Sequence, residues 1–365
     1  MSTHPLTNRV LVAAALAATT AFAFLPDGED PAVTRGRELF DHAFRIHEGV
    51  GGPGLNADSC RACHRDPMMG GAGGLELNVT RFGFDNNGQG PFQNLPGGQG
   101  ASRLYPPITP LREEIPANAD CFEQRQTPSL LGFGLVDAIP EAAIVAHEDP
   151  FDLDQDGITG VARRVTVNGA TEIGRFGWKA QLPRLEDFVH DATFNELGIT
   201  TPDPGRHFSV STDTDAVADP EISLDRIGEM TAFIASLPAP ARGNSTDPRV
   251  AQGEQVFTEV GCAKCHIPSL PSPSGPVQLY SDLLLHHVWP PEFRGMAEPD
   301  AESGVYRTSP LWGIKDTAPY LHDGRAENLV SAIQFHDGEA ANVRNAFFAR
   351  SAADRQALIL FLRDL

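Results

Sequence analysis

Apolar residues at helical spacing mark two segments, one near the middle of the chain and one at its end. In residues 223–237 and 352–365, hydrophobic positions recur three or four residues apart, which predicts two amphipathic helices. Ser351 with Asp354 forms a capping box at the start of the second. The residues expected on the buried faces are Leu224, Ile227, Ile234 and Leu237 in the first helix, and Leu358, Phe361, Leu362 and Leu365 in the second.

Short motifs repeat between the two halves that these helices close. The repeated pairs are Arg35-Gly36-x-x-Leu39-Phe40 with Gln252-Gly253-x-x-Val256-Phe257, and residues 126–132 (QTPSLLG) with residues 307–313 (RTSPLWG). The chain therefore has the pattern of a diverged tandem repeat. Residues 238–248 are rich in Pro, Ala and Ser and predict a linker. We expect one domain over residues 24–240, with insertions, and another over residues 248–365.

Strand patterns are scarce along the chain. Residues 161–173 predict one small hairpin with Asn168-Gly169 as its turn. Residues 70–110 are rich in Gly, Asn and Pro, and we expect a long loop ordered by function or by a bound group. The expected fold is mainly α-helical, with long loops and little β-structure.

The first 23 residues have the pattern of an export signal. Arg9 precedes an apolar run over residues 10–18, and Ala21-Phe22-Ala23 matches the A-x-A cleavage pattern. The run is too short to span a bilayer, and no other stretch approaches that length. We expect a periplasmic or secreted protein with no membrane span after cleavage. An uncleaved N-terminal anchor is the alternative.

Charge and composition narrow the function classes. The formal net charge of −20 argues against nucleic-acid binding, because no basic patch is available to neutralise phosphates. The same charge permits a cationic electron-transfer partner. With 35 Gly and 30 Pro the chain is rich in loops, which suits a protein whose cofactor replaces part of the side-chain core.

Two C-x-x-C-H motifs carry the chemistry. They consist of Cys60, Cys63 and His64, and of Cys262, Cys265 and His266. In this motif two thiols add across haem vinyl groups and the His ligates iron, so each half is predicted to be a cytochrome c-type domain with one covalent haem c. A zinc or redox C-x-x-C pair is the alternative, which the adjacent His and the export signal disfavour. Cys121 has no thiol left to pair with, and we expect it to be a buried thiol.

Further motifs resemble the bacterial di-haem oxidoreductases, whose members are often labelled thiol oxidoreductases or peroxidases and are related to di-haem cytochrome c peroxidases and MauG-like enzymes. The motifs are Gly174-Arg175-Phe176-Gly177-Trp178-Lys179-Ala180, Asn195-Glu196-Leu197-Gly198-Ile199-Thr200, Ser309-Pro310-Leu311-Trp312-Gly313 and Leu321-His322-Asp323-Gly324-Arg325-Ala326. The resemblance covers nearly all of the mature chain and is more specific to the superfamily than to one reaction. It implies two c-type haem domains that face each other.

The resemblance also implies iron ligands. His64 and His266 are the proximal ligands. In relatives the distal ligand of the second haem follows the H-D-G-R segment and the next helix, where peroxidases have Met and MauG-like enzymes have Tyr; His336 falls on that position. A bis-His iron is six-coordinate and lower in potential than a His/Met iron. Met296 is the main alternative ligand, and the pair His286–His287 a weaker one.

Two side chains are implied to act near the first haem. In peroxidases a Glu takes a proton from peroxide and returns it to the leaving oxygen, and Glu196 lies in the matching segment. Trp178 matches a Trp between the haems, where an indole can relay an electron. A solvated helix-end charge and a core aromatic are the respective alternatives. The distal His of some peroxidases has no secure match, and His190, near in sequence, can be a surface residue.

An acidic loop forms a candidate cation site. Asp152, Asp154 and Asp156 stand at alternate positions before Gly157, like the start of a calcium loop. Arg163 occupies the position where an EF-hand has Glu, so the loop is not an EF-hand. Members of the di-haem family hold a calcium between their domains, which favours calcium here, and an Asx turn is the alternative.

These patterns together predict an exported di-haem c-type cytochrome oxidoreductase, peroxidase-like in its reaction. Electrons from a small redox protein or another donor are expected to enter at the C-terminal haem, and hydrogen peroxide or an oxidisable substrate to meet the N-terminal haem. The alternatives are a non-enzymatic electron carrier and a MauG-like oxidase that modifies a partner protein. The spin state of the irons distinguishes the electron carrier from the enzyme, because a carrier keeps both irons six-coordinate and low-spin.

Overall fold

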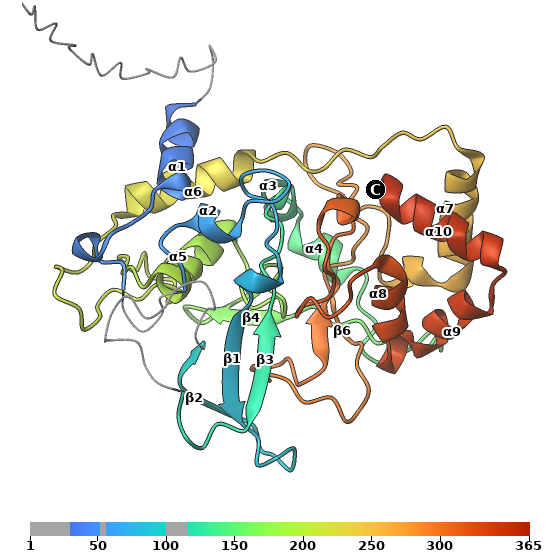
Figure 1. Ribbon diagram of the computed structural model, residues 1–365, viewed down its shortest axis with the longest axis horizontal. Helices are drawn as coiled ribbons and strands as arrows, with labels where there is room; N and C mark the ends of the chain where they lie inside the picture. The colour runs from blue at the N-terminus through green and yellow to red at the C-terminus, as the bar shows by residue number, and fades with distance from the viewer. Residues whose placement is uncertain (1–29, 52–55, 100–114) are drawn as a thin grey trace, which may run out of the picture.

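A computed structural model describes residues 30–51, 56–99 and 115–365, so the expected export signal lies outside the described residues. Helices make up 34% of the described residues and strands 12%, which confirms a mainly α-helical fold. The helices are α1 (Pro31–Asp41), α2 (Cys60–Cys63), α3 (Phe133–Asp137), α4 (Glu141–Val145), α5 (Leu185–Leu197), α6 (Leu224–Ser236), α7 (Pro248–Val260), α8 (Leu329–Phe335), α9 (Ala341–Ala349) and α10 (Ala352–Asp364). Figure 1 shows α1, α2, α5 and α6 on one side of the molecule and α7 to α10 on the other.

A three-stranded antiparallel sheet lies where a long loop was expected. Its order is β2-β1-β3, with strands β1 (Val79–Phe84), β2 (Gln93–Gln99) and β3 (Cys121–Arg125). The expectation of a loop over all of residues 70–110 is therefore wrong. The pairing of β1 with β3 places Arg81 opposite Glu123, so opposite charges face each other across the strands. Such pairing joins segments far apart in sequence, which local composition does not reveal.

Two further hairpin-like pairs complete the strands. The predicted hairpin is confirmed as β4 (Arg164–Val167) and β5 (Ala170–Ile173), joined by Asn168 and Gly169 at φ 51° and 77°. Positive φ at both turn residues is the requirement of a type I′ turn, which Asn-Gly meets at least cost. The pair β6 (Leu285–His287) and β7 (Val305–Arg307) was not predicted.

The two closing helices are confirmed as α6 and α10. Ser223 caps α6 by accepting a hydrogen bond from the Arg226 amide, and Ser351 caps α10 through the Asp354 amide. All the apolar residues expected to point inward are buried except Leu224, which is 39% exposed. Leu224 is the first residue of α6, and the expectation that it is buried is wrong.

The repeated glycine motif produces the same helix crossing twice. Helix α1 packs on α6, and α7 packs on α10. A Cβ atom at Gly36 would lie 1.9 Å from the carbonyl oxygen of Glu229, and a Cβ atom at Gly253 would lie 2.0 Å from that of Ala357. Only glycine permits so close an approach of two helix backbones. The motif therefore encodes a specific contact between the first and last helix of each half.

The phenylalanine of the same motif also repeats its contact. The ring centroids of Phe40 and Phe233 lie 5.3 Å apart at 62°, and those of Phe257 and Phe361 lie 5.3 Å apart at 63°. Edge-to-face aromatic pairs of this kind add about 0.5–1.5 kcal/mol beyond their area burial. The two halves thus share side-chain geometry as well as helix order.

The segment between the halves has no helix or strand from Leu237 to Asp247, as the linker prediction requires. Arg242 in this segment pairs with Glu254 and Asp364 of the second half. Two main hydrophobic clusters follow the halves, although five residues of the second half pack into the first cluster: Leu270, Val277, Leu279, Leu283 and Leu284. The division into domains at residues 24–240 and 248–365 stays a prediction. Of the described helices, none is both long and apolar enough to cross a membrane.

Candidate functional site

The first C-x-x-C-H motif forms a short helix that presents His64. Ser59 caps α2 by accepting a hydrogen bond from the Ala62 amide. The His64 Nδ1 lies 3.2 Å from the Gly71 carbonyl oxygen, to which it donates. Burial lowers the pKa of His64 to about 4, so the ring is neutral at pH 7. With Nδ1 protonated and hydrogen-bonded, Nε2 keeps the lone pair that a metal requires.

The second motif prepares His266 in the same way. It begins with a 3-10 turn over Cys262–Lys264, and the His266 Nδ1 donates to the Tyr280 carbonyl oxygen at 3.0 Å. Burial, and then the proximity of His336, lower the pKa of His266 to about 4. The ring is again neutral, with Nε2 available.

The backbone around the two histidines is also duplicated. The Leu130 amide donates to the Gly70 carbonyl, one residue before the acceptor of the first His. The Leu311 amide donates to the Leu279 carbonyl, one residue before the acceptor of the second. Leu130 and Leu311 belong to the repeated segments 126–132 and 307–313, so these segments hold the acceptor carbonyls in place.

The cysteines of the motifs are not arranged as a zinc or thiol redox site. Burial raises the pKa of Cys60, Cys63 and Cys262 to about 12, so these thiols are protonated at neutral pH. Within the described residues, no group of three metal-ligating side chains includes a residue of the first motif. Cys265 of the second motif lies in one such group, with Asp282 and His286, but a structural zinc site needs four ligands, so the zinc alternative is disfavoured. Cys121 is 1% exposed, which confirms the predicted buried thiol.

A cavity of about 300 Å³ opens beside the second motif. Its lining is mostly apolar, and it includes Cys262, Cys265, His266, His336, Trp178 and Arg307. It extends to Ala72 and Pro128, next to the backbone that holds His64. An apolar space with two thiols and a neutral imidazole on its wall fits a covalently attached haem.

His336 lies in this cavity, and Met296 does not. The His336 Nδ1 donates to the Ala332 carbonyl oxygen at 2.8 Å, which leaves Nε2 available. Met296 is fully buried in a loop where its amide bonds to Glu123. The geometry therefore favours His336 as the second ligand, which stays a prediction.

The pair His286–His287 is less suited to bind iron. The His286 Nε2 lies 2.9 Å from a carboxylate oxygen of Asp282, and its Nδ1 faces Glu339 at 3.4 Å and the Cys265 sulfur at 3.7 Å. Both ring nitrogens are thus engaged. The adjacent His287 does not line the cavity, although its amide bonds to Glu339.

Glu196 lies close to the first motif at the end of α5. Its carboxylate accepts a hydrogen bond of 2.8 Å from the Asn56 side chain, and its charge raises the pKa of Cys60 and Cys63. Desolvation raises the pKa of Glu196 to about 7. This is not the behaviour of a solvated helix-end charge. A carboxyl group with a pKa near neutrality can both accept and return a proton at physiological pH.

Two residues that influence Glu196 were not identified from the sequence: Asn56, which bonds to it, and Asp191, a nearby acidic group. Asn56 also anchors the loop before the first motif, because its backbone amide donates to the Glu196 carbonyl oxygen at 2.7 Å. Asp191 lies earlier on α5, accepts a hydrogen bond from Asn195, and has its pKa raised to about 6 by desolvation. The spacing of Asp191, Asn195 and Glu196 on one helix is a sequence signal, whereas nothing local links Asn56 to Glu196, 140 residues away.

His190 is buried, so its interpretation as a surface residue is wrong. Its Nδ1 lies 2.8 Å from the Thr201 hydroxyl, inside the first half. The interpretation relied on the polar side chain of His190 and did not take into account that the residue lies on the buried face of α5.

Trp178 joins the two repeated segments. Its indole Nε1 donates to the Gln126 carbonyl oxygen at 3.0 Å, and its own carbonyl accepts from the Arg307 amide at 2.9 Å. Gln126 and Arg307 are the first residues of the two repeated segments. Trp178 also lines the cavity, and its role as an electron relay between haems stays a prediction.

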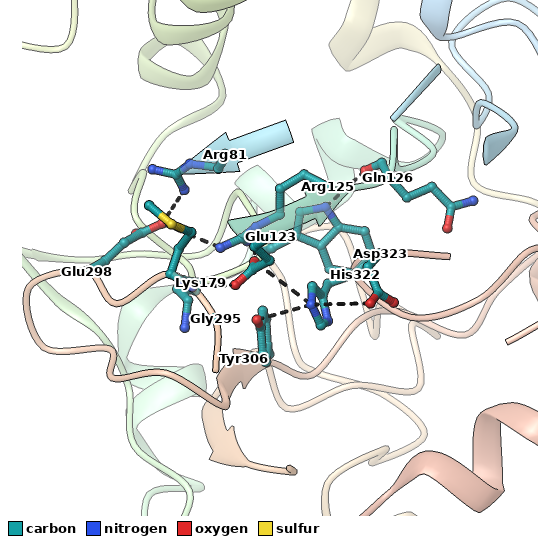
Figure 2. A network of polar contacts seen from close by, with 12 residues as sticks. Arg81, Glu123, Arg125, Gln126, Lys179, Gly295, Glu298, Tyr306, His322 and Asp323 are labelled. Carbon is teal, nitrogen blue, oxygen red and sulfur yellow. Dashed lines mark hydrogen bonds and ion pairs between the residues drawn. The ribbon is translucent and has the colours of Figure 1, made fainter. Parts of the chain in front are cut away.

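Next to Trp178 lies a buried polar network that the sequence did not indicate (Figure 2). The rings of Tyr306 and His322 stack at 4.1 Å, and the Tyr306 hydroxyl lies 3.2 Å from the His322 Nε2. Burial lowers the pKa of His322 well below its usual value, so the ring is a neutral acceptor. The Lys179 ammonium lies 4.3 Å from the centre of the Tyr306 ring.

The same network holds a buried carboxylate among three arginines. Arg81 and Arg163 each pair with Glu298 at 2.8 Å. Although burial opposes it, the guanidinium groups of these two residues and of Arg125 lower the pKa of Glu298 to about 2. Glu298 is therefore a fixed negative charge that holds strands β1 and β3 to the second half (Figure 2).

The acidic loop has a different set of converging residues from the one expected. Asp156 pairs with Lys264 at 3.0 Å. Carboxylate oxygens of Asp149, Asp152 and Asp154 lie within 4.8 Å of one another. Asp152 and Asp154 also accept hydrogen bonds from amides of the loop, as in the Asx-turn alternative. Calcium binding here stays a prediction.

Comparisons with known proteins identify the family. A family model described as "Di-haem oxidoreductase, putative peroxidase" matches residues 120–365. No curated protein sequence matches. Similar solved structures include hydrazine synthase of Kuenenia stuttgartiensis, with 14% identity, a TM-score of 0.44, and coverage of 98% of this chain and 100% of that chain.

Two further structures have TM-scores in the same range. The di-haem peroxidase BthA of Burkholderia thailandensis is 15% identical, with a TM-score of 0.46 over 92% of this chain and 86% of that chain. A MauG-like protein associated with microbial copper homeostasis is 16% identical, with a TM-score of 0.42 over 93% of this chain and 91% of that chain. The family match spans more than half of the chain and includes Glu196, the second C-x-x-C-H motif and His336. This chain therefore belongs to the di-haem oxidoreductase family and is a haem-dependent, peroxidase-like oxidoreductase.

Proposed function

We propose that the chain binds two haem c groups covalently, one through each C-x-x-C-H motif. The observation that carries this proposal is the duplicated histidine environment. In both halves a neutral His donates Nδ1–H to a backbone carbonyl, at 3.2 Å for His64 and 3.0 Å for His266. The phenylalanine of the repeated motif lies at 6.3 Å from the first His ring and 6.5 Å from the second. A scaffold built twice in this form supports one cytochrome c-type domain in each half.

The N-terminal half is proposed to react with peroxide. A haem held by Cys60, Cys63 and His64 would supply the redox chemistry of peroxide cleavage. Glu196 provides the proton chemistry: its carboxylate takes a proton from one peroxide oxygen and delivers it to the leaving oxygen. Asn56 orients this carboxylate by donating to it at 2.8 Å. The pKa of about 7 allows both protonation states of Glu196 near neutral pH.

The C-terminal half is proposed to accept electrons. His266 and His336 would ligate its iron, because both present a free Nε2 in the same cavity. An iron held by both histidines would be six-coordinate, which would suit electron transfer rather than peroxide binding. Trp178 lies between the repeated segments and is proposed to relay electrons to the N-terminal half. A small redox protein, cationic to match the charge of −20, is the proposed donor.

Export and calcium complete the proposal. Covalent haem attachment fits a periplasmic or secreted protein, as the signal-like first 23 residues predict. Calcium remains a proposed ligand of the acidic loop, with Asp149 joining Asp152 and Asp154 in place of Asp156.

Mass spectrometry and spin-state spectroscopy test this function. The denatured protein is expected to retain two haem additions. The spectrum is expected to show one low-spin haem, and a second that is high-spin at least when the first is reduced. Zinc, or one haem addition, would contradict the cofactor assignment. Two low-spin haems that are inert to peroxide in every redox state would favour the electron carrier instead.

A further inference from the structure

Arg307 is a buried cation without an ion-pair partner among the residues that the structure describes. It ends strand β7 and is 8% exposed. Its Nε donates to the Gly177 carbonyl oxygen at 3.1 Å and its Nη1 to the Thr308 carbonyl oxygen at 3.0 Å. Among the described residues, no carboxylate lies within 4.0 Å of its guanidinium. Burial lowers the pKa of Arg307 to about 10, so it still carries its charge at pH 7.

A buried and unpaired charge costs several kcal/mol, so such a group normally faces a partner of opposite charge. Other buried arginines of this protein follow the rule: Arg125 pairs with Glu123, and Arg163 with Glu298. Arg175 and Lys179 donate to backbone carbonyls, but neither lines the cavity. Arg307 does line it.

The free part of the guanidinium is its Nη2. In the described part of the chain this nitrogen has no hydrogen-bond partner, yet it is not among the unpartnered atoms that are fully enclosed by protein. It therefore keeps accessible surface in a residue that borders the cavity. Two N–H groups are available there to an acceptor.

The other cations around the cavity are already neutralised. His286 faces the carboxylates of Asp282 and Glu339. Arg344 pairs with Asp337. Asp282 affects Arg307 only from beyond ion-pair distance. Arg307 is thus the one cation of the described lining that lacks a carboxylate.

We propose that Arg307 binds a propionate of the haem attached at Cys262 and Cys265. This inference rests on the proposed function, because it requires haem in that cavity. A haem is an apolar macrocycle with two carboxylates, and the cavity is an apolar space with one unpaired guanidinium. An arginine held by two carbonyls presents its remaining N–H groups in a fixed direction, which suits a carboxylate acceptor.

The location gives this ion pair a role between the halves. The Arg307 amide donates to the Trp178 carbonyl, and its Nε donates to that of the neighbouring Gly177. The propionate would therefore lie beside the loop that carries the indole. Arg307 acts as a positioning residue: it orients the haem relative to Trp178, and its positive charge stabilises the reduced, less positive haem.

The test compares Arg307→Gln with Arg307→Lys in the intact holoprotein. The midpoint potential of the C-terminal haem is measured by spectroelectrochemical titration between pH 5 and 9. We expect the Gln variant to lower the potential and to make it depend on pH near neutrality, because an unpaired propionate protonates more readily. The Lys variant should restore most of both properties. Arg249→Gln, which removes an exposed arginine that pairs with Asp247 outside the cavity, is the control and should leave both unchanged.

Two further measurements keep the inference separable from the proposed function. Mass spectrometry counts the haems, and a chain without haem on the second motif would overturn the proposed function itself. Two bound haems with an unchanged potential and pH profile in Arg307→Gln would overturn only the role of Arg307. If that variant does not fold, resonance Raman spectra of the wild-type protein decide: a propionate-bending band typical of a carboxylate without hydrogen bonds would overturn the ion pair.

Discussion

The two halves of this protein share one scaffold and differ in the titratable group that each adds to it. Each half has a glycine-mediated crossing of its first and last helices and a neutral His that donates to a backbone carbonyl. Near the first motif stands the carboxyl group of Glu196, with a pKa of about 7. Beside the second stands the imidazole of His336. Under the proposed function this scaffold holds a haem in each half, and the added group gives the two sites different chemistry.

The difference extends to the charge around each site. The carboxyl groups of the first half, Glu196 and Asp191, have pKa values raised by desolvation and can exchange protons near neutral pH. The second half instead brings a fixed cation, Arg307, to its cavity. Under the proposed function, proton transfer takes place in the first half, and a stable positive charge that favours electron uptake lies in the second.

Removing each cysteine pair in turn tests the equivalence of the halves most strongly. Cys60→Ala with Cys63→Ala, and separately Cys262→Ala with Cys265→Ala, should each reduce the covalent haem count from two to one, because the thioether bonds of each site are independent. Haem additions are counted by mass spectrometry of the denatured protein. Loss of both haems in either variant would show that the halves do not assemble independently.

Replacing Glu196 tests the functional difference. Glu196→Gln keeps the hydrogen-bonding shape but cannot accept the proton, so we expect the peroxide reaction to slow by about 100- to 10,000-fold. In the wild type the ionised carboxylate is the active base, so the rate should rise with pH through about 7, and the variant should lose this rise. Stopped-flow mixing with peroxide measures both. The two haem spectra serve as the control and should stay unchanged.

The repeated glycines test whether the scaffold is equivalent in energy as well as in shape. Gly36→Ala and Gly253→Ala place a Cβ about 2 Å from a carbonyl oxygen of the facing helix, so each should destabilise its half by about 1–3 kcal/mol through overpacking. Thermal unfolding followed by circular dichroism measures the loss. Gly228→Ala, in α6 but with nothing within 4 Å of the new Cβ, is the matched control and should not lower the unfolding temperature.

The parts that the sequence predicted correctly are the local ones. The helices α6 and α10 and the β4–β5 hairpin follow from periodicity, caps and an Asn-Gly turn within a few residues. The sheet of β1 and β3 was missed because its strands pair about 40 residues apart. The same limit applies to the site, where motifs indicated Glu196 but not Asn56, and where the sequence showed Arg307 without showing that it is buried and unpaired.

Replacing His336, the proposed distal ligand of the second haem, is expected to have a smaller effect that is detected by spectroscopy. His336→Ala should convert a low-spin haem to a high-spin or water-bound one, and His336→Met should raise the potential of that haem because a thioether favours reduced iron. Electron paramagnetic resonance and redox titration measure the two effects. Met296→Ala is the control and should leave both unchanged, since Met296 lies outside the cavity. The opposite outcome would transfer the role to Met296.

Of the substitutions considered, Asn56→Ala is expected to have the smallest effect, which it exerts through the pKa of Glu196. Desolvation raises this pKa, and the hydrogen bond from Asn56 lowers it. Asn56→Ala removes the lowering contribution, so the pKa of Glu196 should move up and the rise of the peroxide rate should shift to higher pH. A hydrogen bond to a charged group contributes about 1.5–3 kcal/mol, and this free energy sets the upper limit of the pKa shift. Below neutral pH the variant should react more slowly than the wild type, and at high pH the two rates should converge. A variant that is equally slow at every pH would show that Asn56 positions the loop before the first motif rather than tuning the carboxylate.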